Sequence, residues 1–223
     1  MPVRVAIGIL ALSVLVSSCS GSSGVDEAPS TPEGAVVSWI EAVDAGDTAS
    51  ASAAIHPESL AIILGIENGI SSDDMAAYLT SGVPMTLQKS YWDSFSDGFT
   101  EFAEKPLSSL AVGEAEEFVS EGETFASVPV TSGPVSKSVV IVRQRSDQTW
   151  EVDMVASLGD GFSKLLLDRY EQLGSDESAG RIRLAYAEVV EPSLWAAIAD
   201  GSFGDAFTRT ALTLIDRIDE DNA

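Results

Sequence analysis

The 223-residue sequence contains one cysteine and one histidine. A lone Cys19 cannot form a disulfide within the chain, and His56 as the single imidazole excludes metal sites built from several His or Cys ligands. A Ser–His–Asp triad would depend on His56 alone as its base. No G-x-S-x-G motif and no glycine-rich phosphate-binding loop occurs. We therefore expect no cofactor, no metal site and no catalytic residue that a motif could identify.

Basic residues are also scarce, with 12 Lys and Arg against 35 Asp and Glu, a net charge of −23. A field of this sign repels nucleic acid and the anionic headgroups of membranes. We therefore expect no nucleic-acid partner and no basic patch that holds the protein on a membrane. The acidity is explained either by solubility in the cell exterior or by attraction of a basic protein partner or of cations.

The chain begins with a short apolar run rather than a membrane-spanning one. Residues 5–16 are almost entirely apolar and follow a single positive charge at Arg4. A transmembrane helix needs about 20 such residues. The run has the length of a signal-peptide hydrophobic region, with a positive segment before it and small residues after it.

The small residues after the run are Val16-Ser17-Ser18-Cys19, which resemble the lipobox of bacterial lipoproteins. The resemblance implies cleavage between Ser18 and Cys19, a diacylglyceryl group on the Cys19 sulfur, and a further acyl chain such as palmitate on the new amino group. Two or more acyl chains anchor a protein stably, whereas one binds with K on the order of 10⁴ M⁻¹. The alternatives are an ordinary secretory signal with a chance cysteine, or a short anchor that stays uncut.

These features predict a signal peptide at residues 1–18, then the lipidated cysteine and a flexible Gly/Ser-rich tether at 19–30. Helices follow. Thr31 and Asp47 are suited to cap helices, and the pairs His56-Pro57 and Asn68-Gly69 are suited to bound one. The predicted helices cover residues 32–45, 48–55, 57–67, 73–79 and 86–102.

From residue 109 the apolar residues recur with a period near two, which indicates strands. Runs at 110–112 with 116–119, at 124–131, at 138–144 and at 150–155 predict an antiparallel meander. The last strand would place Trp150 and Met154 on one face and Asp153 on the other. Helical spacing then returns, and Pro192 is expected to break one helix. The predicted helices cover residues 162–173, 182–189, 192–199 and 203–218.

This order of elements resembles the NTF2-like superfamily over residues 31–156. The residues that carry the resemblance lie at 32–39, 45–47, 139–143 and 149–153. The resemblance implies an α+β fold in which amino-terminal helices pack on a curved antiparallel sheet, the NTF2-like cone. Residues 157–223 would form a carboxy-terminal helical extension. Members of this superfamily often hold a pocket in the mouth of the cone, and some are isomerases, dehydratases or cyclases that use Asp, His or Tyr there.

The corresponding candidates in this chain are His56, Tyr91, Asp93 and Asp153. Each also has a plain structural interpretation: His56 as a capping or surface residue, Tyr91 as core, Asp93 as a solvated side chain, and Asp153 as a residue that faces away from the pocket. Tyr91, Phe95 and Phe99 recur at helical spacing and could line an apolar pocket or fill the core.

The sequence therefore favours a lipid-anchored protein on the outer face of the cell membrane. We expect a non-enzymatic binding or accessory module that engages a small apolar ligand or a basic protein. One alternative is an NTF2-like enzyme, an isomerase or dehydratase, acting on a small hydrophobic substrate. Another is a structural component of an envelope complex.

Overall fold

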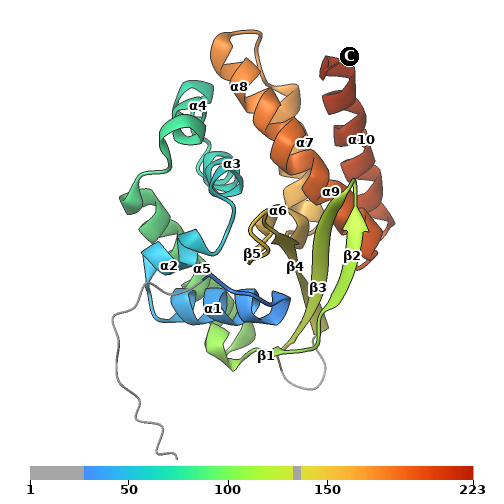
Figure 1. Ribbon diagram of the computed structural model, residues 1–223. Coiled ribbons are helices and arrows are strands. Elements are labelled where there is room, and N and C mark those ends of the chain that lie inside the picture. Colours follow the sequence, from blue (N-terminus) through green and yellow to red (C-terminus); the bar gives the residue numbers. More distant parts are fainter. Residues whose placement is uncertain (1–27, 133–136, 223) are drawn as a thin grey trace, which may run out of the picture.

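The structure, a computed structural model, describes residues 28–132 and 137–222 (Figure 1). The predicted lipobox, Cys19 and most of the tether lie outside the described residues. In the part of the chain that is described, no helix is both long enough and apolar enough to cross a membrane.

The described chain begins with five helices, each started by a local signal. The Thr31 hydroxyl accepts a hydrogen bond from the Gly34 amide at 3.1 Å, and the Asp47 carboxylate accepts one from the Ser50 amide at 3.2 Å, so both caps form as predicted. The five helices are α1 (Pro32–Asp44), α2 (Thr48–Ala53), α3 (Pro57–Glu67), α4 (Ser72–Ser81) and α5 (Met85–Ala103).

A short 3₁₀ turn, η1 (Leu107–Ser109), leads into an antiparallel sheet whose central strand pairs on both sides. The turn between β2 and β3 has positive φ at both Glu121 (48°) and Gly122 (83°), which matches the two-residue hairpin geometry that suits the twist of strands. The order is β1-β3-β4-β5, with β2 also paired to β3. The strands are β1 (Ala111–Val112), β2 (Glu116–Ser120), β3 (Glu123–Thr131), β4 (Lys137–Gln144) and β5 (Trp150–Val152).

The edge strand β5 is covered by chain from the amino-terminal part. The Trp150 amide donates to the Pro29 carbonyl at 2.9 Å, and the Val152 amide donates to the Ala54 carbonyl at 2.8 Å. Helix α1 packs against β3, β4 and β5. All three residues of β5 are buried, so this edge of the sheet is not exposed for pairing with a strand of another chain.

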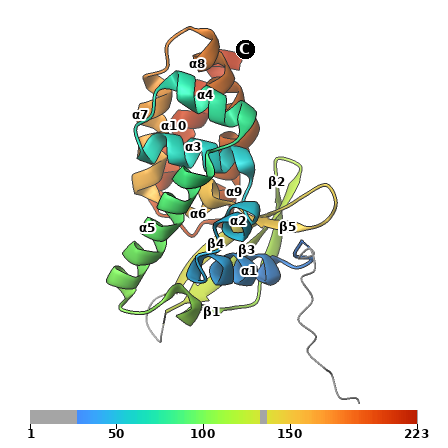
Figure 2. The same cartoon turned by 90° about the vertical axis from the view of Figure 1, so that its left-hand side faces the viewer.

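The remaining helices pack on the sheet and on α3 and α4. Helix α8 contacts α4, α7 contacts α3 and α10, and α9 contacts α6 and β2. Figure 2 shows α7, α8 and α10 beside α3 and α4 at one end of the molecule, with α1 at the other. These elements are α6 (Met154–Ser157), α7 (Asp160–Glu171), α8 (Glu177–Ala185), the π-helical turn η2 (Tyr186–Val190), α9 (Glu191–Asp200) and α10 (Asp205–Asn222).

The predicted fold class is confirmed: the protein is α+β, with helices before and after a curled antiparallel half-barrel sheet. The predicted strand at 150–155 was wrong in its second half, because β5 ends at Val152. The Asp153 carboxylate accepts a hydrogen bond from the Ala156 amide at 2.9 Å and caps α6 instead. Asp153 is therefore a buried turn residue and not part of a two-faced strand.

The expected break at Pro192 was also wrong. The helical path runs from α8 through η2 directly into α9, with Pro192 in the first turn of α9. Proline inside a helix lacks an amide donor and collides with the carbonyl four residues earlier. The wider π turn that precedes Pro192 relieves this conflict, so the chain continues instead of stopping.

Candidate functional site

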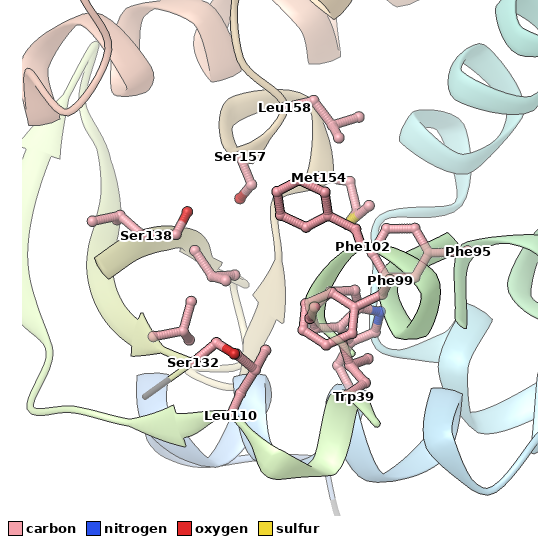
Figure 3. A pocket seen from close by; sticks show the side chains of 15 residues that line it. Trp39, Phe95, Phe99, Phe102, Leu110, Ser132, Ser138, Met154, Ser157 and Leu158 are labelled. Atoms are coloured by element: carbon pink, nitrogen blue, oxygen red, sulfur yellow. The ribbon is translucent and has the colours of Figure 1, made fainter. Parts of the chain in front are cut away.

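A cavity of about 530 Å³ lies between the carboxy-terminal half of α5 and the sheet (Figure 3). Its walls come from α1, α5, η1, β3, β4 and α6, so residues from distant segments of the chain meet there. The side chains that line it are Trp39, Phe95, Phe99, Phe102, Ala103, Leu107, Leu110, Val130, Ser132, Ser138, Val139, Val140, Met154, Ser157 and Leu158.

Three phenylalanines of α5 form one side of the cavity. Phe95, Phe99 and Phe102 are four and three residues apart, which places them on one face of the helix. Phe95 and Phe99 are partly buried, whereas Phe102 is 90% exposed. The stripe therefore runs from the core outward, and Phe102 stands at its solvent end.

Trp39 of α1 completes this aromatic wall from below. Its ring centre lies 5.7 Å from that of Phe95 and 6.4 Å from that of Trp92. The Trp92 indole nitrogen donates to the Ser52 hydroxyl at 2.8 Å. The indole nitrogen of Trp39 is buried without a hydrogen-bond partner among the described residues. Edge-to-face and tilted contacts of this kind hold the rings in defined positions, so the wall is pre-formed.

Serine hydroxyls lie on the other side. In Figure 3 the rings gather on one side of the cavity and Ser132, Ser138 and Ser157 lie opposite them. The Ser157 hydroxyl donates to the Asp153 carbonyl at 2.7 Å and accepts from the Ile141 amide at 2.9 Å. This hydroxyl is thus held in place by the backbone of β4 and α6.

The lining residues that the structure describes carry no formal charge. Within residues 28–132 and 137–222, no group of three or more His, Cys, Asp or Glu side chains is arranged to hold a metal ion. The cavity thus combines an aromatic and aliphatic surface with hydroxyl groups, the composition of a site for a small apolar molecule.

His56 and Tyr91 lie elsewhere. His56 occupies the residue before α3, is half-buried, and makes no capping hydrogen bond with its side chain. Tyr91 is buried against Trp92, with ring centres 4.8 Å apart. Burial, and secondarily the charge of Glu67, raises the pKa of the Tyr91 phenol well above its usual range. Neither side chain lines the cavity. Asp93, one of the two acidic candidates, is exposed and pairs with Lys89 at 2.7 Å.

Asp153 is buried but committed to other groups. Its carboxylate accepts from Arg143 at 3.0 Å and from the Ser193 hydroxyl at 2.9 Å, in addition to capping α6. Arg143 also donates to Ser193 at 3.0 Å. The structure therefore brings Asp153 to a buried ion pair between β4, α6 and α9, and does not bring it together with His56 or Tyr91.

A second cavity, of about 680 Å³, lies on the side where the described chain begins. Its lining includes Pro29 and Trp150 together with the charged side chains of Glu41, Asp47 and Arg145. Arg145 is paired with the buried Glu151 at 2.6 Å. This mixture of charges and the absence of an aromatic wall among its described lining residues distinguish it from the first cavity.

Sequence reasoning found part of the cavity. It identified Phe95 and Phe99 as a stripe, and the structure places both on the wall. It did not identify Leu110, Val130 or Met154 as lining, because nothing in their local pattern separates a residue facing a cavity from one facing the core.

No protein-family model matches this chain, and the comparisons with curated proteins and with solved structures also yield no match. The resemblance to the NTF2-like superfamily therefore stays a prediction. The functional argument depends on the site itself.

Proposed function

We propose that this protein is a lipid-anchored, extracytoplasmic binding module that holds a small apolar ligand in the cavity beside α5. The observation that carries the proposal is the aromatic wall of Trp39, Phe95 and Phe99 facing a cavity of about 530 Å³. Sites for small molecules usually enclose about 300–1,000 Å³ and are mostly apolar with a few polar groups.

The location rests on the amino-terminal sequence. A positive residue, a short apolar run and the tetrapeptide that ends in Cys19 support export and lipidation. The net charge of −23 gives the folded part no attraction to anionic lipid, so the acyl chains would hold the protein at the membrane without electrostatic help. The module would face the exterior, where it can take up a ligand from the surroundings or from the lipid phase.

Binding can be tested with a neutral apolar dye, N-phenyl-1-naphthylamine, whose fluorescence rises in apolar sites. The chain from Ser20 onward suits this test because every described contact is made by residues 28–222. We expect one dye per protein molecule. Val139→Phe, which adds volume inside the cavity, should weaken dye binding by about tenfold or more, since it displaces the ligand and crowds the wall.

The matched control is Val119→Phe. Val119 lies on β2, is 69% exposed and is not among the residues that line the cavity. This variant should bind the dye like the unmodified protein, and circular dichroism should show that both variants are folded. Equal loss in both variants, or no saturable binding by the unmodified protein, would contradict the proposed ligand site.

The anchor is tested separately through Cys19. Cys19→Ala should abolish metabolic labelling with a radioactive or clickable fatty acid and leave uncleaved precursor or protein released from membranes. Ser22→Ala, a change at a nearby small polar residue, should leave labelling and membrane fractionation as they are. Labelling that persists in Cys19→Ala would overturn the lipoprotein assignment.

A further inference from the structure

We infer that the ligand of the α5 cavity is a neutral amphiphile with a hydroxyl group, such as a long-chain alcohol or an acylglycerol, and not an ionised fatty acid. This inference rests on the proposed function and concerns the same cavity. It follows from the placement of the serines, the hydrogen bonds of Ser157, and the charges around the site.

The cavity has two chemically different sides. The rings of Phe95, Phe99 and Phe102 form a surface for hydrocarbon, and Ser132, Ser138 and Ser157 lie across from them (Figure 3). A ligand that fills this space therefore meets apolar carbon on one side and hydroxyl groups on the other. A molecule with a hydrocarbon body and a compact polar end matches this division, because its polar end can bond to hydroxyls that a pure hydrocarbon could only cover.

The hydrogen bonds of Ser157 favour a polar end that can donate. A serine hydroxyl has one proton to donate and two lone pairs to accept with. The Ser157 proton is directed to the Asp153 carbonyl at 2.7 Å, and one lone pair accepts from the Ile141 amide at 2.9 Å. The proton is thus held by backbone carbonyls, that of Asp153 and the more distant one of Ile141 at 3.4 Å, and the remaining lone pair is open to a donor on the ligand. An alcohol can donate in this way, whereas an ionised carboxylate is an acceptor only.

The charges point to the same class. A carboxylate removed from water needs a cation or several donors, and its burial is otherwise costly. Among the described lining residues none is charged. Arg143, on the same strand as Val139 and Val140, is already paired with Asp153 at 3.0 Å and lies 3.4 Å from Glu123. The overall charge of −23 further disfavours an anionic ligand.

The experiment compares two ligands that differ only at the polar end. 1-Decanol and decanoate, each kept below its solubility or micelle limit at neutral pH, compete with N-phenyl-1-naphthylamine for the chain from Ser20 onward. We expect decanol to displace the dye at a concentration about tenfold lower than decanoate, or less. Decanoate that competes as well as decanol, or a dye that neither displaces, would overturn the inference.

A charge placed among the serines should reverse the preference. Ser138→Lys puts a cation at the polar side of the cavity, so the affinity for decanoate relative to decanol should rise by about tenfold. Ser146→Lys makes the same change in net charge at an exposed hairpin residue outside the cavity lining and should leave the ratio unchanged. An unchanged ratio in Ser138→Lys contradicts the inference. Dye binding is measured independently of this competition. If the unmodified protein did not bind the dye, that result would count against the proposed function instead.

Discussion

Arg143 is the residue on which the buried polar structure of the protein depends most. Its guanidinium bonds to Asp153 and Ser193, lies 3.4 Å from Glu123, and stands 5.2 Å above the ring centre of Phe125. Arg143 and Asp153 are both buried. A buried ion pair adds little over an apolar pair, but removal of one partner leaves the other charge without compensation.

We therefore expect Arg143→Met to lower the free energy of unfolding by about 3–5 kcal/mol, because Asp153 remains buried without its cationic partner. Urea titration followed by circular dichroism measures this loss. Lys89→Met removes an ion pair between exposed side chains, 60% and 50% accessible, and should cost no more than about 0.5 kcal/mol. The double variant Arg143→Met/Asp153→Asn should recover part of the loss. Equal effects of Arg143→Met and Lys89→Met would contradict this view of the pair.

At the scale of elements, two helical glycines show how differently the same residue is used. Gly65 lies in α3 where it meets α4, and a methyl group there would meet Met75, with its Cγ at 3.2 Å, and Ile70 Cδ1 at 3.3 Å. Gly98 lies in the carboxy-terminal half of α5, where a methyl group would meet nothing within 4 Å. The first glycine allows close packing of two helices, whereas the second only lowers the helical propensity of α5.

Gly98→Ala should therefore raise the free energy of unfolding by about 0.5–1 kcal/mol, because alanine loses less backbone entropy in a helix. Gly65→Ala should lower it by about 1–3 kcal/mol, because the added methyl group crowds the contact with α4. Both values come from denaturant titration of otherwise identical chains. If both substitutions stabilise the protein, the α3–α4 contact is looser than the structure indicates.

At the scale of the whole molecule, the excess of acidic groups sets the electrostatic conditions. Glu191, at the start of α9, shows its effect locally: burial first, then the charge of Asp219, raises the pKa of its carboxyl above 4.5, while a hydrogen bond from Trp195 opposes the shift. A raised pKa means that the folded state accommodates the protonated carboxyl more easily than the ionised one. Its ionisation at neutral pH therefore destabilises the fold.

Glu191→Gln should raise the melting temperature at neutral pH, since it removes this unfavourable charge. The gain should shrink as the pH falls and vanish below 4.5, where Glu191 is protonated in the folded and unfolded states alike. Thermal unfolding across this pH range measures the difference. Glu188→Gln removes one exposed charge from the preceding turn and should have a smaller effect. A gain from Glu191→Gln that persists in acid would contradict the electrostatic explanation.

The parts of the fold that sequence reasoning predicted well are those with local causes. Helix α3 was predicted at 57–67 and is found there, because Pro57, the apolar run and Asn68-Gly69 lie within one short segment. Strand β5 was assigned differently from the structure because the place where it ends depends on distant partners. Asp153 turns the chain where Arg143 and Ser193 can bond to it, and these partners come from β4 and α9.

Within the candidate site, helix α5 likewise has some features that follow from the local sequence and others that depend on distant segments. The spacing of Tyr91, Phe95, Phe99 and Phe102 correctly indicates one helical stripe. Along that stripe Tyr91 is buried away from the cavity, Phe95, Phe99 and Phe102 line it, and Phe102 is at the same time exposed to solvent. The period of a helix determines which residues share a face. It carries no information on how far the helix extends past the sheet.

The sequence by itself determined the acidity of the molecule, the helix caps, the strand-forming segments and the hypothesis of a lipid anchor at Cys19. Each depends on composition or on residues a few positions apart. Only the tertiary structure decided that Arg143 and Asp153 form a buried pair and that Trp39 and Met154 meet at one cavity. The reason is physical: capping and periodicity act through neighbouring backbone groups, whereas burial and desolvation depend on side chains that folding brings together from distant segments.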